Sequence, residues 1–391
     1  MNPLVLLLLP HFLPGSRYGG PVRTIANLLT QLDGRYRFHL LTSDREFHDQ
    51  RPYDLPANRW LPWQGQTRVR YADPRHLGPR DLRELGRELR PDVVYLNSFF
   101  HPRFSLLPYA LWRRGAFGAA GLVLAPRGEF APGALAQKAL KKRLLLGAAR
   151  LAGRYREPLW QASSPFEAQD IQRVWPGARL QIARNLGTTP ADLPARERGK
   201  RAGELRLLFV GRVSRMKNLD FLLERLTDLP GRVELQVAGP AEDAGYLELC
   251  RAVAARLPAS VQVRFLGAVE PAAVPGLLRN ADLLFQPSLG ENFGHAILEA
   301  LAHGLPALIS DRTPWRGLSA AQAGWDLPLE DPAAFRTALL EALALDEPAW
   351  QSWSHGAREL GLRSLGDPEP VLQHEELFRR AMADHRWRGR A

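Results

Sequence analysis

The sequence is poor in sulfur and contains no long apolar run. Its 391 residues include a single cysteine, Cys250, so no internal disulfide can form and a reducing compartment is favoured. The apolar run Leu4–Leu9 ends at Pro10. This run is too short to span a membrane, and it lacks the charge and cleavage site of a signal peptide. We expect a buried strand there, in a cytoplasmic chain that is at most peripheral on the inner face of the plasma membrane.

Motifs for metal and nucleic acid are also absent. The sequence has no Asp-x-Asp motif, no zinc spacing of His and Cys, and no zinc-finger, RNA-recognition or homeodomain pattern. We therefore expect no metal, no cofactor and no nucleic-acid partner. The formal net charge is nevertheless +11. Nucleotide phosphates and an anionic membrane surface are the partners that we favour for this charge, although part of the arginine excess can reflect a GC-rich genome.

The length and the pattern of apolar segments indicate two domains. With 45% hydrophobic residues the chain can fill two cores. Short apolar strands alternate with helical segments, as in parallel sheets covered by helices. This rhythm stops in a Pro-, Arg- and Gly-rich stretch and restarts at Leu205. We predict a first domain at 1–187, a linker at 188–203, a second domain at 204–366 and a C-terminal helical segment at 367–391.

The most informative stretch is Ser288–His303. It follows the apolar run Asp282–Pro287, which predicts a buried strand, and it opens with the glycine-bracketed loop Gly290–Gly294. The apolar spacing after this loop predicts a helix that ends at Gly304. A loop that leads into a helix N-terminus suits an anion such as a pyrophosphate.

Two carboxylates accompany this anion site. Glu291 lies in the loop and Glu299 in the predicted helix, eight residues further on, which spans about 12 Å at the helical rise. That distance matches the separation between the two sugars of a nucleotide sugar. Carboxylates can accept hydrogen bonds from the paired hydroxyl groups of each sugar. A solvated acidic loop with one exposed helical glutamate is the alternative interpretation.

The pattern resembles a known family. Glu291 and Glu299 fit the E-x7-E signature of the retaining GT-B glycosyltransferases, often called family 4. The sequence of residues 290–306 is similar to that family throughout. Gly211–Asn218, which reads Gly-Arg-Val-Ser-Arg-Met-Lys-Asn, resembles the family's second signature. The resemblance covers nearly the whole chain. It implies an α/β fold of two doubly wound Rossmann-like domains facing a cleft, with a C-terminal helix that crosses back to the first domain.

The resemblance also implies roles in the second domain. Arg212 and Lys217 would neutralise the donor diphosphate, although a solvated basic turn is the alternative. Glu291 would hold the donor hexose and Glu299 the ribose. The loop that contains Val269 would contact the nucleobase through its backbone. Backbone N–H groups for sugar and phosphate would come from Asn292, Phe293 and Gly294.

In the first domain, five candidates follow predicted strands. Gly19 and Gly20 resemble the family's first loop, which approaches donor and acceptor; an ordinary tight turn is the alternative. His101 can exchange a proton in the cleft or simply cap a helix. Arg127 can contact phosphate or a sugar hydroxyl, and Glu129 can accept from the acceptor hydroxyl. The alternative for this last pair is an internal Arg–Glu contact.

A long basic helix is predicted at Ala134–Tyr155. Its cations and its apolar stripe are typical of a helix that lies on an anionic bilayer, while a packed surface helix with a solvated charged face is the alternative. The apolar stripe consists of Leu140, Leu144, Ala148 and Leu151.

The predicted function is transfer of a hexose from a nucleotide sugar, UDP- or GDP-linked, to an acceptor hydroxyl with retained anomeric configuration. A carbohydrate or lipid-linked carbohydrate is the expected acceptor, because Pro126–Phe130 resembles a polysaccharide-building branch of the family. A nucleotide-sugar epimerase of GT-B shape should lack the paired glutamates. A non-catalytic sugar-binding protein should have a broken donor site, yet Arg212, Lys217, Glu291 and Glu299 are all present.

Overall fold

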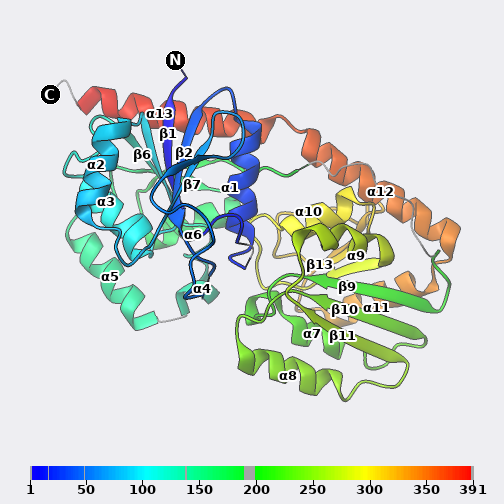
Figure 1. Ribbon diagram of the computed structural model, residues 1–391. Coiled ribbons are helices and arrows are strands. Elements are labelled where there is room, and N and C mark those ends of the chain that lie inside the picture. Colours follow the sequence, from blue (N-terminus) through cyan, green and yellow to red (C-terminus); the bar gives the residue numbers. More distant parts are fainter. Residues whose placement is uncertain (1, 16, 48, 137–138, 189–198, 389–391) are drawn as a thin grey trace. The chain divides into compact units, whose positions relative to one another are not determined.

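The computed structural model describes residues 2–15, 17–47, 49–136, 139–188 and 199–388. The chain divides into two compact units, one formed by Met1–Leu186 with Pro368–Ala391 and the other by Gly187–Asp367. The first boundary lies one residue from the predicted one, and the C-terminal segment belongs to the first unit. Each unit is an α/β sandwich built on a mainly parallel sheet (Figure 1).

The first unit holds an eight-stranded sheet in the order β3-β4-β2-β1-β5-β6-β7-β8. All neighbouring strands are parallel except β3 with β4. The strands are β1 Leu4–Leu8, β2 Arg37–Ser43, β3 Trp60–Pro62, β4 Arg68–Ala72, β5 Val93–Asn97, β6 Gly121–Ala125, β7 Leu159–Ala162 and β8 Arg179–Ile182. The helices are α1 Gly20–Gln31, α2 Pro79–Leu89, the π-helical turn η1 Pro102–Leu106, α3 Leu107–Trp112, α4 Pro132–Ala136, α5 Ala139–Leu151, α6 Pro165–Val174 and α13 Glu369–Arg388.

Strand β1 shows why this sheet is covered on both faces. All five of its residues are apolar and buried, as expected of a central parallel strand. Val5 and Leu7 point into a core cluster shared with α1 and α13, and Leu6 and Leu8 point into the opposite cluster with α2 and α3. The continuous apolar run therefore fills two cores at once.

Helix α13 completes the first of these cores. It contacts β5, β6 and β7 and lies along this sheet, drawn in red in Figure 1. Leu377, Phe378 and Ala381 are fully buried. A Cβ atom on Gly121 of β6 would come within 2.1 Å of the Ala381 carbonyl oxygen, so the glycine allows the helix to approach the strand closely. The predicted crossover of the C-terminal helix to the first domain is confirmed.

The second unit holds a six-stranded parallel sheet in the order β11-β10-β9-β12-β13-β14. The strands are β9 Glu204–Val210, β10 Arg232–Ala238, β11 Val261–Gly267, β12 Leu283–Gln286, β13 Ala307–Ser310 and β14 Gly324–Leu327. The helices are η2 Arg215–Lys217, α7 Leu219–Glu224, α8 Ala244–Ala254, η3 Pro271–Ala273, α9 Val274–Asn280, α10 His295–Ala302, α11 Pro332–Ala344 and α12 Glu347–Gly366.

The strand order of the second unit contains a switch point. From β9 the chain proceeds outward through β10 and β11, and it then returns to the other side of β9 to form β12. Connections therefore leave β9 and β12 in opposite directions. Open α/β sheets bind ligands outside the carboxyl ends of the strands at such a point, so the loops after Val210 and Gln286 are the first place to look for a site.

Three predictions about elements need correction. The polar stretch 44–66, rich in Pro, Arg and Trp, predicts a long loop that touches the acceptor, but it contains the edge strand β3, which pairs antiparallel with β4. The predicted helix Ala134–Tyr155 is observed as α4 and α5, of which α5 ends at Leu151, and residues 137–138 lie outside the described residues. Strand β14 and helix α12 were not predicted, because β14 is a short strand and α12 has weak apolar periodicity.

The predicted linker is partly corrected as well. Residues 189–198 lie outside the described residues. The end of the stretch is packed on the second unit, since Lys200 is buried and its Nζ donates to the carbonyl oxygens of Glu204 and Leu345. Residues 199–203 therefore belong to the second unit.

Phe378→Ala is expected to reduce the free energy of unfolding by about 3–5 kcal/mol, because it leaves a cavity in the first unit's core. Urea unfolding followed by circular dichroism measures the loss. Leu372→Ala on the same helix is the matched control, since this leucine is 51% exposed. Equal losses in the two variants would contradict the packing of α13 described above.

Candidate functional site

Two loops meet at the switch point of the second unit. Gly211 follows β9 with φ +152°, and a Cβ atom there would lie 3.4 Å from Gln286 Nε2 and 3.6 Å from Lys217 Cε. The loop after β12 is joined to the loop after β9 through the backbone, where Leu289 N–H donates to the Met216 carbonyl at 2.8 Å. The two signature stretches are therefore adjacent in space.

An ion pair connects the same two loops. Lys217 Nζ contacts Glu291 Oε1, with side chains 20% and 12% exposed. The same carboxylate oxygen accepts from Ser288 Oγ at 2.9 Å, and Glu291 N–H donates to the Arg312 carbonyl at 3.0 Å. Glu291 is thus held at both its backbone and its carboxylate. The structure brings together one predicted phosphate ligand and one predicted sugar ligand.

Asn218 sets the direction of the chain after Lys217. It adopts the left-handed conformation with φ +58° and lies between the turn η2 and helix α7. Asparagine tolerates this conformation better than most residues. The Lys-Asn pair of the signature therefore combines a cation with the turn that positions it.

Arg212 lies in the same loop with a different partner. Its Nη1 is 3.1 Å from Glu242 Oε2, and the two side chains are 39% and 30% exposed. An ion pair with this exposure contributes little, typically about 0–1 kcal/mol. The guanidinium can therefore exchange Glu242 for a phosphate at small energetic cost.

Helix α10 begins where the second loop ends. Gly294 takes φ +77° before the first turn and provides no side-chain cap. A Cβ atom on it would lie 2.9 Å from Ile297 Cδ1. Trp315 Nε1 donates to the Phe293 carbonyl at 2.8 Å and fixes the loop. The uncapped first turn suits an anionic ligand group.

The remaining predicted residues of this unit lie on or beside helix α10. Glu299 is partly buried within α10, and Asn292 is a partly buried residue of the loop before it. Val269 follows β11 and packs beside the core cluster that includes α10. Their expected ligand contacts stay predictions.

Sequence reasoning missed Gln286 as a candidate. It ends β12, is 1% exposed, and its Oε1 has no hydrogen-bond partner among the described residues. Its Nε2 lies beside Gly211. The signal was present in the sequence, because Gln286 is the polar residue at the carboxyl end of an apolar run. Parallel sheets bind ligands at the carboxyl ends of their strands.

In the first unit, the predicted glycines occupy the start of α1. Gly19 has φ +80° and precedes the helix, and Gly20 is its first residue. The loop follows β1, so it lies at the carboxyl edge of the sheet. The expected approach of a ligand to this backbone stays a prediction.

His101 caps a helical turn in the first unit. Its Nδ1 accepts from the N–H groups of Arg103 and Phe104 at 3.3 and 3.2 Å and caps η1. Burial lowers the pKa of His101 to about 4, with a smaller effect from the charge of His11. The capping alternative is observed, and the expected proton exchange in the cleft stays a prediction.

Arg127 braces strand ends inside the first unit. Its Nε and Nη2 donate to Asn97 Oδ1 at 3.0 and 2.6 Å, Nη2 also donates to Tyr95 Oη at 2.6 Å, and Nη1 donates to Asn185 Oδ1 at 3.0 Å. The backbone has φ +54°. The residue is therefore committed to internal contacts, and its expected contact with phosphate or sugar stays a prediction.

Glu129 accepts hydrogen bonds within the first unit. Its Oε1 accepts from Ser98 Oγ at 2.8 Å, and its Oε2 accepts from the N–H groups of Phe99 and Phe100 at 2.6 and 3.0 Å. Burial raises the pKa of this carboxyl group. The carboxylate thus binds the backbone after β5, and the described residues show no ion pair between it and Arg127. Its expected contact with an acceptor hydroxyl stays a prediction.

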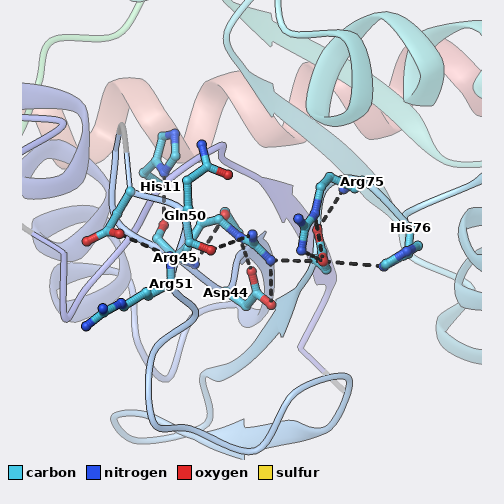
Figure 2. A network of polar contacts seen from close by, with 10 residues as sticks. His11, Asp44, Arg45, Gln50, Arg51, Arg75 and His76 are labelled. Carbon is cyan, nitrogen blue, oxygen red and sulfur yellow. Dashed lines mark hydrogen bonds and ion pairs between the residues drawn. The ribbon is translucent and has the colours of Figure 1, made fainter.

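A charged network occupies the carboxyl ends of β2 and β4 (Figure 2). Arg45 is 7% exposed and contacts Asp44 at 2.8 Å and Asp73 at 2.9 Å. His11 Nδ1 lies 3.2 Å from the Arg45 carbonyl oxygen, and the Arg75 hydrogen bonds hold the pKa of Asp73 below its usual range. The network anchors the start of the loop that was predicted to touch the acceptor.

Two features are absent from the described residues. No group of three His, Cys, Asp or Glu side chains in the described part of the chain is arranged to hold a metal ion. Within the same residues, no helix combines the length and apolar character that crossing a bilayer requires. Metal independence stays a prediction. Cys250 is a buried thiol whose pKa is raised to about 11, mainly by burial.

Comparison with known protein sequences adds a family. Residues 194–359 match the family described as glycosyl transferases group 1. The D-inositol 3-phosphate glycosyltransferase of Corynebacterium urealyticum is 32% identical over 238 residues, which cover 52% of this chain and 54% of that protein. The chain thus spans about half the length of this curated relative.

Comparison with solved structures identifies the fold. HepE from Anabaena, in complex with UDP and glucose, has a TM-score of 0.65 at 14% identity, and the match covers 96% of this chain and 98% of HepE. WaaG, a glycosyltransferase involved in lipopolysaccharide biosynthesis, has a TM-score of 0.64 at 17% identity, with 96% and 98% covered. At these identities the likeness shows the fold alone, and the predicted GT-B fold is confirmed.

His101→Asn tests the capping role through pH. The folded pKa of about 4 lies below the ordinary value of 6.5, so the stability from the neutral imidazole is present above pH 6.5 and lost as pH falls toward 4. The loss approaches about 3 kcal/mol. Asparagine keeps the cap without titrating, so the variant should lose less stability between pH 7 and pH 4 in urea unfolding. His355→Asn, an exposed site, is the control; identical pH dependence in wild type and His101→Asn would refute the low pKa.

Proposed function

We propose that this chain, whose residues 194–359 match the group 1 glycosyltransferase family, transfers a hexose from a nucleotide-diphosphate sugar to an acceptor hydroxyl with retained anomeric configuration. The contact between Lys217 and Glu291 at the switch point carries the proposal. In this contact the cation proposed to bind phosphate lies beside the carboxylate proposed to bind sugar, on loops that follow adjacent parallel strands.

The donor diphosphate would bind between two cations and a helix. Lys217 has three N–H donors, and Glu291 Oε1 uses one of them, so the same ammonium group can bridge the carboxylate and a phosphate oxygen. Arg212 can leave Glu242 for a second phosphate oxygen. The first turn of α10 adds N–H groups. This arrangement stabilises the negative charge that grows on the leaving group and supports metal-independent transfer.

The two sugars of the donor would bind to the paired glutamates. Ser288 and Lys217 both contact Glu291 Oε1, which leaves Oε2 to accept hydroxyl groups of the hexose. Glu299 lies within the helix, eight residues further on, and would accept from the ribose. The UDP and glucose bound by HepE support a UDP-linked donor; a GDP-linked donor uses the same phosphate and sugar contacts.

The bond changes in transfer are simple. The bond from the hexose C1 to the diphosphate oxygen breaks, and the acceptor oxygen bonds to C1 on the same face. The acceptor proton passes to the departing diphosphate. The protein orients the reactants and stabilises charge, and no side chain becomes covalently bound to the sugar.

The acceptor is proposed to be a carbohydrate or a lipid-linked carbohydrate in synthesis of a bacterial surface polysaccharide. The involvement of WaaG in lipopolysaccharide biosynthesis supports this class. Residues for the acceptor would come from the carboxyl edge of the first unit, near Gly19 and Gly20. We propose that the reaction takes place in the cytoplasm. This compartment supplies nucleotide sugars, and its reducing environment suits the single buried thiol.

The proposed function is tested by incubating the purified protein with a panel of UDP- and GDP-sugars in the presence of a metal chelator. We expect one donor to release nucleoside diphosphate only when an acceptor is present, and we expect Glu299→Ala to abolish this release. Isomerised donor without release would favour the epimerase alternative. No release and no calorimetric binding with any donor would overturn the proposal, whereas tight binding without any turnover on a wide acceptor panel would favour the non-catalytic alternative.

Lys217→Met should weaken binding of the nucleoside diphosphate and lower kcat on the order of 10²- to 10³-fold, since a charge-assisted contact to the leaving group is lost. Calorimetry and the release assay measure the two effects. Lys217→Arg keeps the charge and should recover part of the activity. Arg336→Met removes an exposed cation from α11 of the same unit and should change neither. Unaltered affinity in Lys217→Met would exclude the phosphate contact.

A further inference from the structure

Helix α5 presents an apolar stripe to solvent. Leu140, Leu144 and Leu151 are 72%, 66% and 93% exposed, and Ala148 between them is also exposed. Exposed leucines are common singly, but a contiguous group on one helix marks an interaction surface. The stripe is therefore not the face through which α5 packs on the first unit.

The helix packs through its opposite side. Leu146 and Ala149 are 6% and 7% exposed and belong to a core cluster of the first unit. Lys142 also turns inward, where its Nζ donates to the Ala134 carbonyl at 2.6 Å and lies 4.9 Å from the centre of the Phe100 ring. The leucine stripe therefore faces away from the side on which α5 is attached.

Geometry makes the stripe continuous. At 3.6 residues per turn the four stripe positions fall within about 80° of one another around the helix, and they extend over about 16 Å along it. Lys141 lies beside one border of this sector, and Arg143 and Arg150 lie beside the other. Lys141 and Arg143 are exposed. The apolar sector is therefore bordered by cations on both sides.

Charge identifies the occupant. The sequence contains no Asp or Glu between Glu129, whose carboxylate is buried, and Glu157. We propose that α5 docks on an anionic lipid bilayer, with Leu140, Leu144 and Leu151 inserted among the acyl chains and Lys141 and Arg143 at the lipid phosphates. An apolar stripe with flanking cations is the pattern of an interfacial helix. A second copy of the chain would bring like charges together and is disfavoured.

This surface is independent of the proposed transfer reaction, because it involves none of the donor-site residues. It goes further than a general affinity of a basic protein for anionic lipid, since it requires apolar insertion at three named positions. The contributions of the leucines and of the cations to lipid binding can therefore be measured separately.

Flotation of the full chain with lipid vesicles tests the surface. We expect binding to vesicles of phosphatidylcholine with phosphatidylglycerol and little binding to phosphatidylcholine alone. The triple variant Leu140→Ser, Leu144→Ser, Leu151→Ser should reduce partitioning at least on the order of tenfold, because three apolar insertions are lost. Lys141→Gln with Arg143→Gln should reduce it about fivefold per charge and remove most of the salt dependence.

Controls separate insertion from general effects. Leu249→Ser with Leu372→Ser removes two exposed leucines elsewhere, and Arg256→Gln with Arg336→Gln removes two exposed cations of the second unit; both pairs should bind as wild type. The melting temperature of the triple variant should stay unchanged, because its leucines are exposed. Equal binding of wild type and triple variant would overturn insertion.

A spectroscopic measurement gives a second readout. Cys250 is buried, so a thiol-reactive, environment-sensitive dye can be placed selectively through Leu144→Cys. Its emission should shift to the blue on addition of anionic vesicles, while the same dye at Arg336→Cys should not respond. A shift with increasing protein concentration in the absence of lipid, together with a dimer in analytical ultracentrifugation, would show that a second copy covers the stripe and would refute the lipid assignment.

Discussion

Parallel strands all end at one edge of their sheet, and this constraint determines where a functional site can form. In the second unit it brings the loops after β9 and β12 together, although the residues of their ion pair are 74 positions apart in the sequence. Lys217 and Glu291 neutralise each other's charge. Their pairing at low exposure holds both loops in one arrangement.

The same constraint creates a competing demand. A strand that ends at the carboxyl edge leaves backbone N–H groups that need acceptors. In the first unit the polar residues after β5 and β6 meet this demand, since His101 caps η1 and Glu129 accepts from the backbone after β5. Residues that look available for chemistry in the sequence can therefore be committed to the fold, and only their contacts distinguish the two uses.

The sequence was most informative where a physical pattern is local. Apolar runs and helical spacing located most elements, and the loop between β12 and α10 could be predicted from its glycines and its carboxylate. Partners distant in sequence could not be predicted. Nothing in the spacing links Arg127 to Asn185, or Asp44 and Arg45 to Asp73. Helix α5 has apolar residues on two sides, so periodicity alone could not decide that Leu146 is buried and Leu144 exposed.

Helix α13 has a consequence for the order in which the protein forms on the ribosome. The core between β1, α1 and this helix includes Leu377, Phe378 and Ala381, yet the whole second unit is synthesised in between. Domains usually fold from the N-terminus as they emerge. Here the apolar face that α13 covers stays open until synthesis has passed residue 381, so the second unit can fold before the first is complete.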